Sequence, residues 1–194
     1  IGMLLDLGVK HLSTYMLQVE EGTALEEMVK KNPLLLPEDD ECVEAYTAVA
    51  NFLKSKGFER YEVSNFALPG YESKHNFKYW TGEEYVGFGL SAHSLLKGER
   101  KANFATFRGY YERQLLLVEK LTDEQKIQEH IMLGLRCKNG IDKKFLLSYG
   151  YDIEKNENVN YFIEKDILFE KEDKLYLNEK FYGINNFVIV KLLP

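Results

Sequence analysis

The chain is poor in cysteine, proline and tryptophan. Its 194 residues include two cysteines, four prolines and one tryptophan. Because Cys42 and Cys137 are isolated in the sequence, the chain by itself cannot build a disulfide framework or a cysteine-rich metal cluster. We therefore expect both thiols to be reduced and structural.

Long apolar runs and clusters of basic residues are also missing. The longest apolar runs reach about half of the roughly 20 residues that a membrane helix needs, and the start lacks the basic-then-apolar order of a signal peptide. The formal net charge is −6, which disfavours nucleic acid and anionic membranes as main partners. A cytoplasmic location is the default expectation.

The composition that remains is that of a globular protein. Apolar residues make up 45% of the chain and charged residues 29%, and the length fits one large or two small domains. The first residues, Ile1–Leu5, carry no initiator methionine and run into a segment that resembles a helix end entering a strand. We expect a fragment that begins inside a domain.

The first part of the chain has the pattern of alternating strands and helices. We expect a strand over His11–Val19, a helix over Ala24–Lys31, a second helix from the acidic residues 37–41 to a C-capping Gly57, and a strand over Phe58–Phe66. A strand, helix, strand order of this length favours parallel pairing. Residues 1 to about 96 therefore predict an α/β fold.

Polar and aromatic side chains gather between Tyr61 and Ser94, where another strand is expected over Tyr85–Leu96. In a parallel sheet, ligands bind at the carboxyl ends of the strands. Those ends would be Gln18–Glu20, Asn65–Ala67 and Ala92–Ser94. This stretch is the predicted functional site.

The loop expected at His75-Asn76-Phe77-Lys78-Tyr79-Trp80 offers an imidazole beside large aromatic rings. An imidazole can ligate iron and aromatic rings can stack on a flat macrocycle, which would suit haem or another tetrapyrrole. The alternative is a loop anchored in the core by Tyr79 and Trp80, with His75 solvated. From these residues alone the alternative is somewhat favoured.

Two further features leave alternatives open. Gly87 and Gly89 on one strand face would let a ligand or another backbone approach closely, or would serve a tight bend in a curved sheet. The carboxylate of Glu62 could pair with that of Glu72, Glu83 or Glu84 for acid and base chemistry, although nothing in the spacing requires it. His11 and His130 are expected to be structural.

The last part of the chain predicts helices with sharp caps. Residues 97–120 suggest a connecting segment that ends in a helix. A capping box at Thr122 and Gln125, a helix beginning at Asp142, a third helix near Val159, a hairpin over 167–177 and a final helix give the order of a winged helix. Acidic residues outnumber lysines in its second half, so packing is favoured over DNA reading.

The runs YEVSNFALPGYESKHNFKYW and EEYVGFGLSAHS, with HLSTYMLQVEEGT upstream, closely resemble the oxygen-independent coproporphyrinogen III oxidase family, in its HemW-like haem-chaperone branch. The resemblance implies the C-terminal part of a radical S-adenosylmethionine (SAM) partial (β/α)₆ barrel over 1–118, and a winged-helix-like domain over 119–194. The CxxxCxxC motif that binds the family's 4Fe–4S cluster is absent from this chain.

The same resemblance implies two groups of site residues. The SAM contacts would be Gln18, Ala92 and His93. The oxidases have a different residue at the position of His93. A contact with SAM through the backbone would not depend on that difference. The haem contacts would be His75, Asn76, Tyr79 and Trp80, with His75 as the candidate iron ligand.

The resemblance favours a haem-handling radical SAM protein, of which this part would be inactive alone. The alternatives are a coproporphyrinogen III oxidase, which oxidatively decarboxylates its porphyrinogen substrate, and a winged-helix binding module. Expected partners are haem or porphyrin, and haem-receiving proteins or membrane respiratory partners, but not nucleic acid. A barrel cut in half would also expose an edge near His11–Val19, which we expect a dimer or crystal contact to cover.

Overall fold

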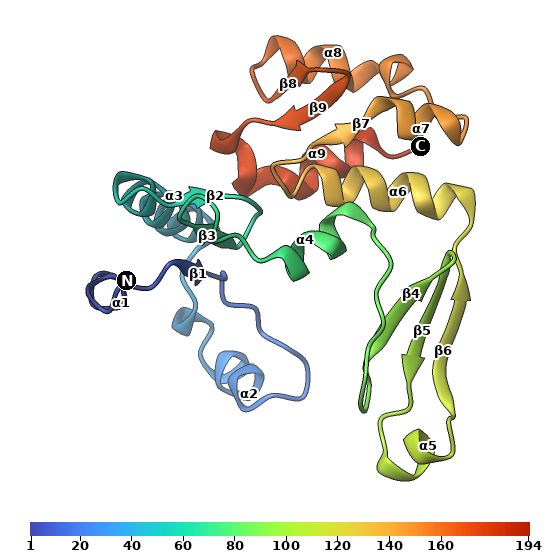
Figure 1. The fold of residues 1–194 in the computed structure, drawn as a ribbon. Helices are drawn as coiled ribbons and strands as arrows, with labels where there is room; N and C mark the ends of the chain where they lie inside the picture. The colour runs from blue at the N-terminus through green and yellow to red at the C-terminus, as the bar shows by residue number, and fades with distance from the viewer. The chain divides into compact units, whose positions relative to one another are not determined.

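The computed structural model describes residues 1–194 and divides into two compact units, Ile1–Glu72 and Ser73–Pro194 (Figure 1). Each unit has its own helices, sheets and buried residues. No helix combines the length and the apolar composition that crossing a membrane would require.

The first unit combines helices with one small sheet. Its elements are α1 (Gly2–Asp6), β1 (His11–Ser13), α2 (Ala24–Lys31), the 3₁₀ turn η1 (Pro33–Leu35), α3 (Asp39–Ser55), β2 (Glu59–Arg60) and β3 (Asn65–Ala67). The predicted helix over Ala24–Lys31 is confirmed, with the Thr23 hydroxyl accepting the Glu26 N–H at its start. Glu38 and Glu41 form a capping box on α3, and Gly57 follows the helix at a φ of +83°.

The sheet of the first unit corrects two predicted strands. Only His11–Ser13 of the expected strand His11–Val19 is paired. The expected strand Phe58–Phe66 is instead a hairpin in which β2 and β3 pair antiparallel around a turn. The turn forms because the Glu62 carboxylate accepts backbone N–H groups of Ser64 and Asn65.

The predicted parallel pairing is also wrong. The strand order is β1-β3-β2, and both outer strands run antiparallel to β3. The hairpin therefore places its returning strand between the two strands that were expected to pair. One face of this sheet supplies Leu12 and Phe66 to a core with Leu53 of α3 and Phe58, so the long helix lies on the sheet as its apolar face predicts.

The second unit begins with α4 (Lys74–Thr81) and continues into a three-stranded antiparallel sheet (Figure 1). The elements of this part are α4, β4 (His93–Leu96), β5 (Glu99–Asn103), α5 (Phe107–Tyr111) and β6 (Leu115–Lys120), in the strand order β4-β5-β6. The expected strand Tyr85–Leu96 folds back on itself, with Tyr85 bridged to Leu95. The predicted connecting segment ending in a helix is wrong, because Leu115–Lys120 pairs with β5 as a strand.

The last elements follow the predicted order of helices and hairpin. They are α6 (Asp123–Gly134), β7 (Ile141–Asp142), α7 (Lys143–Ser148), η2 (Ile153–Lys155), α8 (Glu157–Glu164), β8 (Leu168–Lys171), β9 (Lys174–Leu177), η3 (Glu179–Ile184) and α9 (Asn185–Leu192). The capping box of Thr122 and Gln125 is confirmed, and Asp142 caps α7. A short strand that the sequence did not predict, β7, joins the hairpin in the order β7-β9-β8.

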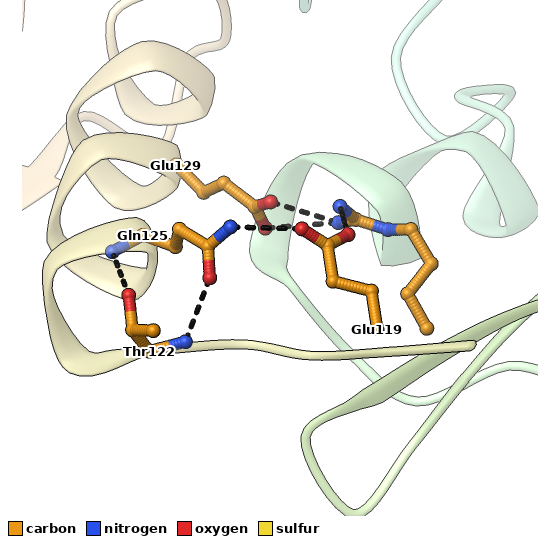
Figure 2. Close-up of polar contacts among 5 residues, drawn as sticks. Glu119, Thr122, Gln125 and Glu129 are labelled. Atoms are coloured by element: carbon orange, nitrogen blue, oxygen red, sulfur yellow. Dashed lines mark hydrogen bonds and ion pairs between the residues drawn. The ribbon is translucent and has the colours of Figure 1, made fainter. Parts of the chain in front are cut away.

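An ion-pair network connects the sheet β4-β5-β6 to helix α6. Arg100 of β5 contacts Glu129 of α6 through two bonds of 2.9 and 3.0 Å and lies 3.5 Å from Glu119 of β6. Gln125 closes the network with a bond of 2.8 Å to Glu119 (Figure 2). Burial alone would lower the pKa of Arg100, but the hydrogen bonds and charge of Glu129 outweigh it and raise that pKa.

Candidate functional site

The HNFKYW run forms helix α4, where the sequence predicted a loop. The Ser73 hydroxyl caps the helix by accepting the Asn76 N–H at 3.2 Å, and Gly82 ends it in the left-handed region at a φ of 68°. The helix is anchored in its own unit by Phe77, whose ring lies 5.5 Å from the Lys138 ammonium. The result is a short helix with both ends capped rather than a loop.

Helical spacing brings two of the predicted haem residues into contact. His75 is exposed and Tyr79 is 40% exposed, and His75 Nε2 lies 2.9 Å from Tyr79 Oη. Asn76 and Trp80 stand one position further along on each turn and are half-buried. The helix therefore offers a nitrogen and an oxygen donor together, either of which can ligate iron.

A second tyrosine extends this cluster. The Tyr85 ring meets the Tyr79 ring edge to face, with centroids 4.7 Å apart. The Tyr85 backbone is fixed by two hydrogen bonds of 3.0 Å to Leu95. Sequence reasoning did not single out Tyr85, because its contact with α4 depends on the fold of residues 82–95.

The SAHS turn holds the residues that were expected to contact SAM. Ser91 has a φ of +57°, Ala92 is half-buried, and the exposed His93 begins β4. Ala92–Ser94 was predicted to be the carboxyl end of a strand, and this prediction is wrong because His93 is the first residue of β4. The site residue His93 opposes Ala102 on β5.

Two glycines precede this turn, and a different feature of the structure explains each of them. A β-carbon at Gly87 would collide with the carbonyl oxygen of His93, so the close approach of another backbone segment accounts for that glycine. Gly89 adopts a φ of +99° in open space. The Asn103 amide donates to the Gly89 carbonyl at 2.9 Å, and the Tyr110 hydroxyl accepts the Gly89 N–H at 3.2 Å.

Gln18, the remaining predicted SAM contact, lies in the other unit. It is exposed and follows β1 in a segment without regular structure. Residues 14–17 of this segment form one wall of an open cavity of about 590 Å³, and the first turns of α3 form the other wall. Gln18 and His93 therefore belong to separate units.

A cluster of polar side chains that the sequence only hinted at lies in the first unit, with Glu62 and Asn65 buried and Ser13 exposed. His11 Nε2 lies 2.7 Å from Tyr61 Oη, and the Ser13 hydroxyl donates to Asn65 Oδ1 at 2.5 Å. Glu62 is 1% exposed, and its burial raises the pKa of its carboxyl against the lowering effect of nearby N–H groups. This cluster orders the hairpin turn.

The suggested carboxylate partners of Glu62 serve other segments. Glu72 accepts the Gly70 N–H at 3.0 Å, Glu83 accepts the Thr81 hydroxyl at 3.0 Å, and Glu84 accepts the Lys97 N–H at 2.6 Å. Each carboxylate thus stabilises a turn in its own neighbourhood. In addition, no group of three or more His, Cys, Asp or Glu side chains is placed to hold a metal ion.

Known proteins match this chain in sequence and in fold. No protein-family model matches it. It is 32% identical to the Heme chaperone HemW of Lactococcus lactis over 97% of this chain and 52% of that protein, and 34% identical to the Heme chaperone HemW of Bacillus subtilis over 93% and 50%. A mitochondrial radical S-adenosyl methionine domain-containing protein 1 of Danio rerio is 32% identical over 68% of this chain.

The fold matches a solved radical SAM structure. Coproporphyrinogen III oxidase (HemN) from Escherichia coli superposes with a TM-score of 0.71 and 13% sequence identity, over 99% of this chain and 50% of that one. The chain spans about half the length of the two HemW relatives and a third of the Danio rerio protein. By sequence, the chain belongs to the family of the haem chaperone HemW, and its fold matches that of the radical SAM protein HemN.

Proposed function

We propose that this chain is the haem-handling part of a radical SAM protein and that it presents α4 to haem. The observation that carries the proposal is the exposed His75 imidazole, which stands on the capped helix α4 beside the Tyr79 hydroxyl. Nitrogen and oxygen donors of these types ligate haem iron in proteins, and the neighbouring rings can pack on the macrocycle. The relatives named as haem chaperones support the same ligand.

The residues proposed to contact haem fit a flat apolar ligand. His75 would supply the iron ligand, and Tyr79 and Trp80 would pack along the ring, with Asn76 as a polar contact. Haem would be the cargo of the protein rather than a resident cofactor. Haem binding would require that the exposed imidazole of His75 reaches the iron.

SAM and a 4Fe–4S cluster belong to the intact protein in this proposal. Gln18, Ala92 and His93 would contact SAM, which supplies radical chemistry when it is bound with the cluster. The chain carries no CxxxCxxC motif, so we propose that it does not hold the cluster and is inactive alone. What its own residues add is the SAHS turn, whose backbone is held in shape by Gly87 and Asn103.

We also propose a domain boundary between residues 118 and 119. The first part would complete a partial (β/α)₆ barrel, and the second would be a winged-helix-like packing domain. We propose no nucleic-acid partner, because α8, the candidate recognition helix, begins at Glu157 and ends at Glu164. Haem-receiving proteins, contact between copies through the edge strand β1 and a cytoplasmic location are further parts of the proposal.

One alternative function has a specific observation in its favour. The solved structure with the matching fold is a coproporphyrinogen III oxidase, which keeps oxidative decarboxylation of a porphyrinogen open for the intact protein. Anaerobic turnover of the intact protein, with the porphyrin products measured, separates the two functions. Formation of protoporphyrinogen would favour the oxidase, and haem binding without turnover would favour the chaperone.

A titration of the chain with ferric haem tests the main proposal. We expect a shifted Soret band that saturates at one haem per chain, and loss of that shift in His75→Ala. The control is Lys78→Ala, a substitution at an exposed position of the same helix, which should retain the shift. The proposal fails if the wild-type chain gives no shift, or if His75→Ala leaves the shift unchanged.

A further inference from the structure

The imidazole of His75 has one ring nitrogen already engaged. Nε2 lies 2.9 Å from Tyr79 Oη, one helical turn further along α4. The two rings stand at 84° to each other with centroids 5.0 Å apart. This geometry fixes both the direction of the imidazole and the nitrogen that stays accessible, because only Nδ1 is left for another ligand.

The Tyr79 ring is itself supported from outside the helix. The Tyr85 ring meets it at 78° with centroids 4.7 Å apart. Tyr85 donates its backbone N–H to Leu95 and accepts the Leu95 N–H, each at 3.0 Å. The support therefore stands on the backbone pairing of Tyr85 with β4, and Tyr79 lies between the imidazole and the Tyr85 ring.

In metalloproteins, a histidine that binds a metal donates its other ring N–H to a hydrogen-bond acceptor, which fixes the tautomer and makes the imidazole a stronger donor. We propose that Tyr79 is this acceptor: His75 Nε2–H donates to Tyr79 Oη, and the lone pair on Nδ1 binds the haem iron. We further propose that Tyr85 is a positioning residue that holds Tyr79 in place. This inference rests on the proposed haem site at His75.

The arrangement needs no proton to leave the pair. The neutral imidazole carries its proton on Nε2, so coordination forms one bond from Nδ1 to iron, displaces an axial water of the aqueous haem and releases no proton from the pair. His75 is the second residue of α4, so no earlier helical turn covers Nδ1. The position on the helix is therefore compatible with ligation through the nitrogen nearer the backbone.

The tautomer can be measured without haem. In the ¹⁵N spectrum of the haem-free chain, we expect His75 to carry its proton on Nε2, and Tyr79→Phe to give a mixture of tautomers because the acceptor is lost. A wild-type chain with the proton on Nδ1 would overturn the inference, since the Nδ1 lone pair would then be blocked.

Haem titrations of the wild type, Tyr79→Phe, His75→Ala and the double variant test the role of Tyr79. Tyr79→Phe should weaken binding about ten- to a hundredfold, the usual effect of losing such a partner, and should shift the spectrum of ferrous haem. In a His75→Ala background the same substitution should have no further effect, because the two residues act as one unit. Full loss of the ferric spectrum in Tyr79→Phe, together with its survival in His75→Ala, would make Tyr79 the iron ligand and overturn the inference.

Tyr85→Leu and Tyr85→Phe form the matched pair for the positioning role. Phenylalanine keeps the ring edge against Tyr79, so Tyr85→Phe should retain the wild-type dissociation constant and ferrous haem spectrum. In Tyr85→Leu, both should shift toward the values measured for Tyr79→Phe. Equal behaviour of the two variants would overturn the role of Tyr85, and far-UV circular dichroism shows that each is folded. A wild-type chain that does not bind haem defeats the proposed function and this inference together, while unchanged binding in Tyr79→Phe defeats this inference alone.

Discussion

The backbone at Gly87 lies so close to the carbonyl oxygen of His93 that a β-carbon at position 87 would overlap it. The same segment is held by the Ser94 hydroxyl, which accepts the Gly87 N–H at 3.0 Å. Glycine at 87 is therefore required by the shape of the SAHS turn itself. The SAHS turn therefore has a defined backbone shape. The proposed backbone contact with SAM at this turn would need such a shape.

Gly87→Ala should disrupt this turn. Because the methyl group meets backbone rather than a flexible side chain, we expect a loss of about 1–3 kcal/mol in the free energy of unfolding, typical of overpacking. Urea unfolding measures it. Gly2→Ala is the control, since a β-carbon there meets nothing within 4 Å, and equal stability of the two variants would contradict the described packing.

The stability of the chain should fall below neutral pH because of His130. Its Nε2 accepts the Asp142 N–H at 2.9 Å, and burial lowers its pKa, opposed by Asp142 and reinforced by Lys174. Since the unfolded state binds the proton first, the free energy of unfolding should be fully present above about pH 6.5 and decrease as the pH falls toward the lowered pKa.

Urea unfolding of wild type and His130→Gln between pH 7.5 and 5 checks this dependence. Glutamine can accept the Asp142 N–H but does not titrate in this range, so its stability should change less with pH. The prediction is wrong if both proteins lose the same stability over the range.

Adjacent leucines on α7 should respond very differently to truncation. Leu146 is fully buried, whereas Leu147 is 60% exposed. Leu146→Ala should cost about 2–5 kcal/mol in the free energy of unfolding, because it removes apolar contacts and leaves a cavity, while Leu147→Ala should change it by no more than about 0.5 kcal/mol. Thermal and urea unfolding measure both, and similar losses would contradict the orientation of α7.

Arg100→Met should destabilise the second unit by about 1 kcal/mol, because it leaves Glu119 and Glu129 facing each other without a cation. The matched control is Arg108→Met. Arg108 pairs with Glu112, the C-cap of its own helix, and its side chain is 88% exposed, so its loss should change stability by less than about 0.5 kcal/mol. Adding Glu129→Gln to Arg100→Met should recover part of the loss, and a further additive loss would argue against coupling in the network.

Helix ends were the part of the fold that the sequence predicted best. The Thr122–Gln125 capping box, the Asp142 cap and the helix before Pro33 all formed as expected. Caps depend on residues within about one turn of each other, so their chemistry is visible in a short window of sequence. Strands were predicted less well, because a strand is defined by a partner that can lie far along the chain.

For the candidate site, the sequence by itself determined the residue types: an imidazole and a phenol four positions apart, and a glycine before the SAHS turn. The tertiary structure decided that these positions lie on a helix, which puts His75 Nε2 within 2.9 Å of Tyr79 Oη, and that Tyr85 supports the pair. It also decided that Leu115–Lys120 is a strand and that Gly87 meets His93. The reason is physical: these outcomes depend on pairing and packing between segments that no local pattern specifies.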